Sequence, residues 1–261
     1  MSWIEALILG IIQGLTEFLP VSSSGHLEIG SVLLDAQSSD NLLFAVIVHL
    51  ATALATIVVF KKDILTLLKD IFKFQWNEST QFAAKILLSM LPVFVVAIFF
   101  KDQIEELFVG NLVLVGSMLL ITGGLLLFAH YKKDGEKNVG YLSAFTIGLA
   151  QAFAVLPGIS RSGSTIATAL ILGVERSKAA RFSFLMVLIP ILGASLLELL
   201  DYAENTGTHT INTSSLIIGF LAAFGSGFLA CKWMIKIVRK GKLTYFAIYC
   251  FIVGFIAILS A

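Results

Sequence analysis

Eight long apolar runs dominate this sequence and decide the environment in which it can fold. They cover about residues 3–21, 41–60, 81–100, 108–129, 139–157, 181–200, 214–234 and 243–260. A helix needs roughly 20 apolar residues to cross the hydrocarbon core of a bilayer. Only 13% of the residues are charged, whereas soluble domains carry about 25%. The sequence therefore predicts an all-α polytopic membrane protein, with one membrane domain over residues 1–261.

The remaining composition excludes several classes of protein. The net charge of +1 gives no reason to expect a nucleic-acid partner. Cys231 and Cys250 lie within apolar runs, and they predict neither a disulfide framework nor a metal site. Residues 61–80 place their charges on one face, so we expect an amphipathic helix in the membrane interface there.

The basic residues distinguish two topologies. If all eight runs cross the membrane, Lys and Arg divide almost evenly between the two sides. If runs 3–21 and 139–157 instead enter and return, each with a short apolar partner (27–34 and 164–173), sixteen of the eighteen basic residues fall on one side. Basic loops stay in the cytoplasm. The sequence therefore favours six transmembrane helices plus two re-entrant helix pairs, with both termini outside. The segments on the outer side carry acidic residues: 35–40, 102–106 and 201–213.

The two predicted re-entrant turns resemble each other. GIIQ at 10–13 and GLAQ at 148–151 match at an offset of 138 residues. The same offset pairs Ser22, Ser24 and Gly25 with Ser160, Ser162 and Gly163. In the favoured topology the pairs enter from opposite sides, and three spans follow each of them. This is an inverted-topology repeat with halves of about 1–129 and 139–261, and its site is expected at the midplane between the halves.

Arg161 is the most informative single residue. An arginine at the centre of a bilayer costs about 2.5–3.5 kcal/mol on insertion scales, so something must offset that cost. One interpretation is a salt bridge to Glu17, the acidic side chain expected at similar depth. The other is a clamp on phosphate oxygens, which a guanidinium fork matches in a bidentate manner. The hydroxyls of SRSGST at 160–165, with a helix N-terminus there, would favour the same anion.

The first turn carries the candidate proton-transfer groups. Glu17 at membrane depth indicates a cation ligand or a general base. Gln13 lies one helical turn before it on the same face, as a packing residue or a second ligand. His26 could exchange a proton near neutral pH or attack phosphorus itself. Among Ser22, Ser23 and Ser24, which could also cap a helix, we favour Ser23 because it aligns with Arg161. His49 lies in no motif, so we expect it to be a packing residue.

The motifs EFLPVSSSGH at 17–26, preceded by Gln13, and PGISRSGST at 157–165 are similar to the two signature motifs of the undecaprenyl-diphosphate phosphatase family. These are the bacitracin-resistance proteins of bacterial membranes, and the resemblance covers the whole chain. It implies hydrolysis of undecaprenyl diphosphate to the monophosphate and inorganic phosphate, which recycles the lipid carrier of cell-wall synthesis and confers bacitracin resistance. It also implies dependence on a divalent cation, Mg or Ca, and a multi-pass protein of the inner membrane whose site opens to the periplasmic side.

The resemblance also assigns roles to residues. Glu17, Ser23 and His26 carry over from the first motif as catalytic residues, and the nucleophile stays open between Ser23, His26 and water. The second motif supplies the substrate-binding residues Ser160, Arg161, Ser162 and Thr165, with Gly163 adding a backbone N–H group. Arg161 would also stabilise charge in the transition state. The metal site is assigned to Gln13 and Glu17. The family allows Glu or Gln at the position of Gln13, and Gln leaves one carboxylate fewer for the cation.

The alternative function is a transporter or flippase of isoprenyl phosphates. Inverted repeats are typical of transporters, and a hydrolase does not need one. A transporter would use Arg161 and the hydroxyls for binding, but it would not need Glu17 and His26 placed for proton transfer. The expected partners in either case are the isoprenyl diphosphate and membrane lipids. Faces of small residues, such as 219–227, would also allow a homodimer.

Overall fold

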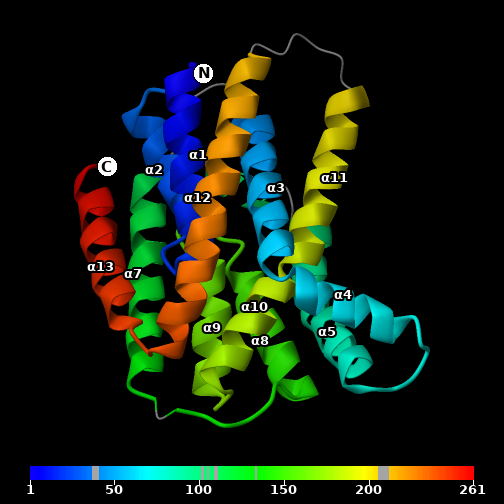
Figure 1. The fold of residues 1–261 in the computed structure, drawn as a ribbon. Coiled ribbons are helices and arrows are strands. Elements are labelled where there is room, and N and C mark those ends of the chain that lie inside the picture. The colour runs from blue at the N-terminus through cyan, green and yellow to red at the C-terminus, as the bar shows by residue number, and fades with distance from the viewer. Residues whose placement is uncertain (37–40, 101–102, 105, 109–110, 133, 205–211) are drawn as a thin grey trace.

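The chain folds as a bundle of helices (Figure 1). The computed structural model describes residues 1–36, 41–100, 103–104, 106–108, 111–132, 134–204 and 212–261. The first half contains α1 (Trp3–Phe18), α2 (Ser23–Leu33), α3 (Asn41–Val59), α4 (Lys61–Ile71), α5 (Glu78–Phe99), the 3-10 turn η1 (Glu106–Phe108) and α7 (Leu112–His130). The second half contains α8 (Tyr141–Phe153), α9 (Arg161–Ile171), α10 (Arg176–Met186), α11 (Leu188–Glu204), α12 (Thr213–Arg239) and α13 (Thr244–Leu259). Within the described residues no strand is present, which confirms the all-α prediction.

Four helical segments of the described chain are long and apolar enough to cross a membrane: α5, α7, the α10–α11 segment Arg176–Leu197, and α12. A fifth appears if α3 and α4 count as one span, although the two are bent by 77° at their junction. Helices α8 and α13 are apolar but shorter. Helix length therefore establishes a multi-pass protein with four or five candidate spans among the described residues. The arrangement of six spans with two re-entrant pairs stays a prediction.

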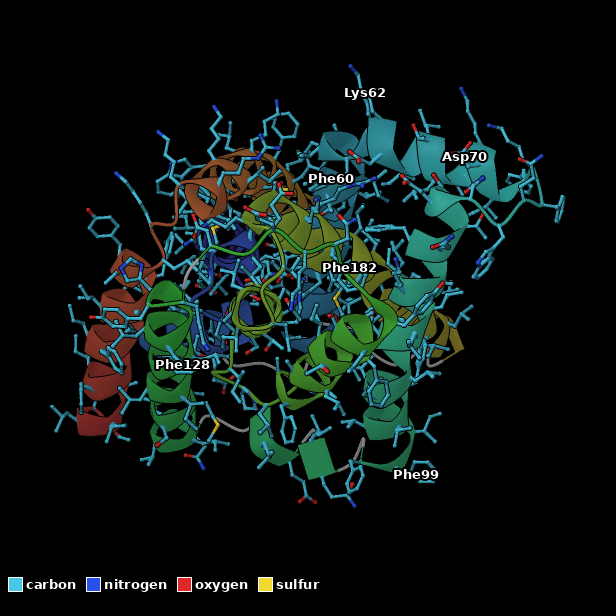
Figure 2. The ribbon with its side chains drawn as sticks, turned by 90° about the horizontal axis from the view of Figure 1, so that it is seen from below. Phe60, Lys62, Asp70, Phe99, Phe128 and Phe182 are labelled. Carbon is cyan, nitrogen blue, oxygen red and sulfur yellow. The ribbon has the colours of Figure 1, made fainter. Side chains whose placement is uncertain are left out.

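The amphipathic helix predicted at 61–80 is present but shorter. Helix α4 ends at Ile71, and α5 begins at Glu78 after the cap residue Asn77, whose side chain accepts a hydrogen bond from the backbone N–H of Thr80. None of the residues of α4 is buried, and the helix extends sideways from the bundle (Figure 1). Figure 2 shows Lys62 projecting from it.

Two helix pairs are interrupted at corresponding places. Helix α1 ends before Leu19-Pro20 and α8 ends before Leu156-Pro157; a proline cannot donate a backbone hydrogen bond. A serine then begins the second helix of each pair. The Ser22 hydroxyl accepts from the N–H of Gly25, and the Ser160 hydroxyl accepts from the N–H of Gly163. The predicted capping role of the first serine cluster is thus confirmed at Ser22.

The two interruptions touch each other, as the sequence predicts for 13–26 and 157–165. The Ser162 hydroxyl donates to the carbonyl of Leu19 at 3.1 Å. A Cβ at Gly25 would lie 3.2 Å from the Cα of Gly158, and a Cβ at Gly163 would lie 3.2 Å from the Cβ of Pro20. Glycines therefore allow the two broken segments to pack against each other at backbone distance.

Small residues also allow α1 and α8 to pack closely on helices of the opposite half. A Cβ at Gly10 of α1 would lie 2.5 Å from the carbonyl oxygen of Gly219 on α12. A Cβ at Gly148 of α8 would lie 2.3 Å from the carbonyl oxygen of Ser89 on α5. Close approach through small residues is the usual way in which helices associate within a bilayer. Each broken pair is thus held by the half of the chain to which it does not belong.

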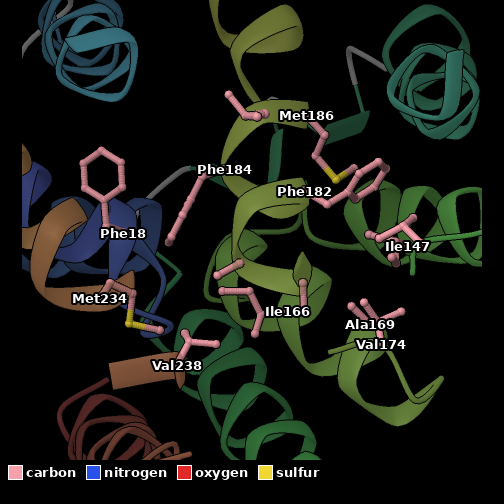
Figure 3. Packing of buried hydrophobic residues seen from close by; sticks show 14 of the residues in the cluster. Phe18, Ile147, Ile166, Ala169, Val174, Phe182, Phe184, Met186, Met234 and Val238 are labelled. Carbon is pink, nitrogen blue, oxygen red and sulfur yellow. The ribbon is translucent and has the colours of Figure 1, made fainter. Parts of the chain in front are cut away.

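The packed interior surrounds α9 and α10. Phe182 and Phe184 of α10 are fully buried, and Phe18 meets Phe184 edge-on with ring centroids 5.8 Å apart (Figure 3). The outer surface is apolar as well: Phe99 is 70% exposed and Phe128 is 56% exposed, and both lie at the periphery in Figure 2. A protein with aromatic side chains outside as well as inside is suited to lipid rather than water.

The connections between helices that carry most of the basic residues lie at one end of the bundle, the lower end in Figure 1. The backbone N–H of Lys137 donates to the carbonyl of Gly173, and Arg176 forms an ion pair with Asp134. Arg181 of α10 pairs with Asp63 of α4 at 2.7 Å. Both chain termini lie toward the other end (Figure 1). The acidic segments predicted on the opposite side, 35–40, 102–106 and 201–213, fall largely outside the described residues.

Candidate active site

A cavity of about 440 Å³ lies where the two interruptions meet. Glu17, Ser23 and Ser24 of the first interruption line it together with Ile159 and Arg161 of the second. Most of the remaining wall is apolar and comes from α3, α5, the two residues after α8, and α11 with the residue before it: Ala45, Val46, Val93, Ala154, Val155, Val187, Pro190, Ile191 and Ala194. The cavity thus combines a small polar cluster with an extensive apolar wall.

An ion pair joins the two interruptions inside this cavity. Nη2 of Arg161 donates to Oε1 of Glu17 at 2.5 Å, with side-chain exposures of 16% and 6%. Nη1 of Arg161 is buried and has no hydrogen-bond partner among the described residues. Both interpretations of Arg161 are therefore compatible, because the salt bridge occupies one guanidinium nitrogen and leaves another for an anion.

The second carboxylate oxygen of Glu17, Oε2, accepts hydrogen bonds from two side chains of the first half of the chain. Ser23 Oγ donates to Oε2 at 2.7 Å, and Nε2 of Gln13, one turn earlier on α1, donates to the same oxygen at 2.9 Å. A serine hydroxyl that donates to a buried carboxylate has the arrangement of a nucleophile beside its base. The structure therefore brings Glu17, Ser23 and Arg161 together, as the motifs predict.

His49 also lies in this cluster, which its interpretation as a packing residue did not anticipate. Its Nε2 lies 3.8 Å from Oε2 of Glu17, its Nδ1 contacts the carbonyl of Ala45 at 2.7 Å, and it lines the cavity. The sequence offered no local motif for it, because α3 brings it in from a separate segment. A histidine in an apolar predicted span was the only available signal.

His26 faces a different direction. Its Nδ1 donates to the carbonyl of Ser22 at 2.8 Å, and its Nε2 lies 2.8 Å from the hydroxyl of Tyr249 on α13. The two rings are stacked. His26 is not among the described residues that line the cavity. In this structure it fixes the turn that carries Ser23, and its predicted catalytic role stays a prediction.

The hydroxyls of the second motif are engaged within the protein. Ser160 caps α9, Ser162 donates to Leu19, and Thr165 donates to the carbonyl of Arg161 at 2.8 Å while sharing a hydrogen bond with Ser183. The N–H of Gly163 is satisfied by Ser160. Of the five predicted substrate-binding residues, only Arg161 lines the cavity. The other four lie at the start of α9, whose first residue is Arg161, and their predicted substrate-binding role stays a prediction.

Gln13 and Glu17 do not form a cation site by themselves. Both oxygens of Glu17 already accept hydrogen bonds, Gln13 presents its amide nitrogen to Oε2, and Arg161 balances the charge of the carboxylate. In the described part of the chain no group of three or more His, Cys, Asp or Glu side chains is placed to hold a metal ion. Oε1 of Gln13 is buried without a partner among the described residues, so it is the oxygen that this pair leaves open to a cation, whose other ligands would have to come from the substrate or water.

Comparison of the sequence with known proteins finds a family match and many relatives. The sequence matches the family described as "Bacitracin resistance protein BacA" over residues 6–256. The chain belongs to this family. Among its relatives are the undecaprenyl-diphosphatase of Bacteroides fragilis (strain YCH46), 55% identical over 99% of this chain and 98% of the relative, and that of Bacteroides thetaiotaomicron, 54% identical over 100% and 99%. A more distant relative is the undecaprenyl-diphosphatase of Carboxydothermus hydrogenoformans, 42% identical over 97% and 95%.

The family match covers both interruptions and every residue of the polar cluster. The bacitracin-resistance family was identified from the two motifs in the sequence, and that identification is confirmed.

Proposed function

We propose that this protein is a membrane phosphatase that hydrolyses undecaprenyl diphosphate to undecaprenyl phosphate and inorganic phosphate. One observation carries the proposal: Ser23, Glu17 and Arg161, drawn from two distant motifs, form one hydrogen-bonded cluster in a cavity. The names of its relatives, which are 54–55% identical over almost the entire chain, support the same activity. Recycling of the lipid carrier and resistance to bacitracin follow from that activity.

The cavity suits an amphiphilic substrate. A diphosphate needs cationic and hydrogen-bonding groups, and Nη1 of Arg161 is a buried donor with no protein partner among the described residues. An isoprenoid tail needs an apolar surface, which α3, α5 and α11 supply in the same cavity. A site embedded among spans lets the tail stay in the apolar phase while the head reaches the polar cluster.

The geometry favours Ser23 as the nucleophile among the three alternatives. Ser23 Oγ forms a bond to the terminal phosphorus, while the bond from that phosphorus to the bridging oxygen breaks. The hydroxyl proton passes to Oε2 of Glu17, 2.7 Å away, which hands it to the departing monophosphate. A water molecule then attacks the phosphoserine, gives a proton to Glu17, and Ser23 regains that proton as inorganic phosphate leaves. Arg161 binds the phosphoryl oxygens and stabilises their charge.

We also propose that the reaction uses a divalent cation, Mg or Ca, which binds together with the substrate. Mg²⁺ is commonly bound by one or two carboxylates together with substrate phosphates. Because Gln13 and Glu17 do not hold a cation by themselves here, its ligands would come mainly from the diphosphate. Its contribution would be to neutralise the charge of the diphosphate.

We also propose that α1–α2 and α8–α9 are re-entrant pairs that enter from opposite leaflets, within repeat halves of about 1–129 and 139–261. The four helices contain 16, 11, 13 and 11 residues, and their interruptions lie together inside the bundle. The remaining helices would then make six spans. With the basic end in the cytoplasm, the termini and the mouth of the cavity would face the periplasm across the inner membrane. The homodimer stays a prediction.

Release of inorganic phosphate from undecaprenyl diphosphate by the purified full-length protein in detergent tests the activity. We expect turnover in the wild type and a loss of about 10²-fold or more in Ser23→Ala, because no nucleophile remains beside Glu17. Acid quenching during turnover should trap phosphate on the peptide that carries Ser23. Ser24→Ala, which removes a neighbouring hydroxyl of the same turn, serves as the matched comparison.

The outcomes separate the alternatives. Lipid flipping without phosphate release would replace the hydrolase by the transporter. Phosphate release that persists in Ser23→Ala would reject the serine as nucleophile and leave His26 or water as the attacking group.

A further inference from the structure

Gln151 of α8 is a buried polar side chain without a protein partner. It is 3% exposed, and neither Nε2 nor Oε1 of its amide forms a hydrogen bond with any described residue. It lines the same cavity as Glu17 and Arg161. A buried amide without hydrogen bonds costs free energy, so such a group is rarely retained unless a ligand or water satisfies it.

The internal repeat explains why this amide has no partner. Gln151 is the counterpart of Gln13 at the offset of 138 residues, and Val155 is the counterpart of Glu17. In the first half Gln13 donates to the carboxylate four residues later at 2.9 Å. In the second half the residue at that position is a valine, which can accept no hydrogen bond. The glutamine is therefore present in both halves, whereas its intrahelical acceptor is present in only one.

The surroundings of Gln151 indicate the chemistry of its ligand. The cavity contains one guanidinium with an unpartnered nitrogen, and the carboxylate of Glu17 is already occupied on both oxygens. The neighbours Ala154 and Val155, which also line the cavity, supply no polar group. A ligand with several acceptor oxygens would accept hydrogen bonds from Nη1 of Arg161 and from Nε2 of Gln151 together. Amide N–H groups are common donors to phosphate oxygens.

We propose that Gln151 is a substrate-binding residue whose Nε2 donates to a phosphate oxygen of the diphosphate, alongside Nη1 of Arg161. This inference rests on the proposed hydrolysis of an isoprenyl diphosphate. The repeat thus yields two glutamines with different tasks. Gln13 holds the carboxylate beside Ser23, and Gln151 holds the substrate.

The test compares Gln151→Met with Thr146→Val in the full-length protein in detergent. Methionine keeps the length of the side chain and removes both polar groups. Thr146 lies on the same helix, its hydroxyl donates to the carbonyl of Leu142, and it does not line the cavity. For Gln151→Met we expect a rise of about tenfold in KM for the isoprenyl diphosphate, with a thermal midpoint equal to or above that of the wild type. Thr146→Val should keep the wild-type KM.

A purely structural role of Gln151 predicts the opposite combination of thermal midpoint and KM in Gln151→Met. If Gln151→Met lowers the thermal midpoint and leaves KM unchanged, the amide serves the fold or an ordered water, and the inference is wrong. Product inhibition locates the contact. Weaker inhibition by inorganic phosphate places Gln151 at the terminal phosphate, and weaker inhibition by the isoprenyl monophosphate places it at the phosphate next to the lipid. Unchanged inhibition by both products, with unchanged KM, contradicts the inference. Failure of the wild type to release phosphate would instead reject the proposed function.

Discussion

Glu17 and Arg161, 144 residues apart in the chain, form a buried ion pair with 2.5 Å between Oε1 and Nη2. Each residue comes from a different half of the chain, so the counter-charge of Arg161 is supplied by the other half. The pair therefore links the folding of the two halves to the assembly of the site. It also leaves Nη1 of Arg161 and the Ser23–Glu17 hydrogen bond directed to a common cavity.

Arg161→Lys should lose activity on the order of 10²-fold, as judged by phosphate release, while the protein still folds. A lysine ammonium can pair with Glu17, but it cannot present a second, fixed N–H group to a phosphate oxygen. Arg181→Lys is the control, because Arg181 pairs with Asp63 on the basic end of the molecule. Full activity in Arg161→Lys would reject the role of the guanidinium as a clamp.

Glu17→Gln should abolish turnover and lower the free energy of unfolding by about 3–5 kcal/mol, because it leaves the guanidinium of Arg161 buried without a counter-charge. The double variant Glu17→Gln with Arg161→Gln removes both charges. It should regain most of the lost thermal stability and remain inactive. Equal instability of the single and double variants would show that the ion pair is not what holds the two interruptions together.

His49→Gln should reduce kcat/KM roughly tenfold, which corresponds to about 1.4 kcal/mol. The reason is the position of Nε2, 3.8 Å from the carboxylate that receives the proton of Ser23. His130→Gln, at the end of α7 beside the carbonyl of Gly241, provides a histidine control remote from the cavity. Steady-state kinetics measure kcat/KM for the two variants. Equal kcat/KM values for His49→Gln and His130→Gln would show that His49 is only a packing residue.

Gly158→Ala should destabilise the protein by about 1–3 kcal/mol, because the residue has φ +94° and an added Cβ would lie 2.4 Å from the carbonyl oxygen of Val115. The shift should also displace Arg161 and reduce activity. Gly124→Ala is the matched change in α7, where a Cβ would meet nothing within 4 Å. It should be neutral or stabilising by about 0.5–1 kcal/mol. Thermal unfolding in detergent compares the two, and similar midpoints would contradict the strained turn.

Much of the architecture could be read from local sequence. Apolar runs indicated the helices, the two matching motifs at 17–26 and 157–165 marked the interruptions, and the serines within these motifs indicated where the following helices begin. These signals act within a few residues, through backbone conformation and capping, and they do not depend on the rest of the fold. Helix ends were less accurate: α4 stops at Ile71, and α12 continues to Arg239, five residues beyond the predicted run.

The amino-acid sequence by itself determined a helical membrane protein with two matching motifs, because hydropathy and residue chemistry are properties of the chain. Tertiary structure alone decided which side chains share the cavity. It added His49 from α3, turned His26 toward Tyr249, and engaged the hydroxyls of Ser160, Ser162 and Thr165 inside the protein. Such contacts join segments far apart in the chain, and they depend on how the helices pack rather than on any local pattern.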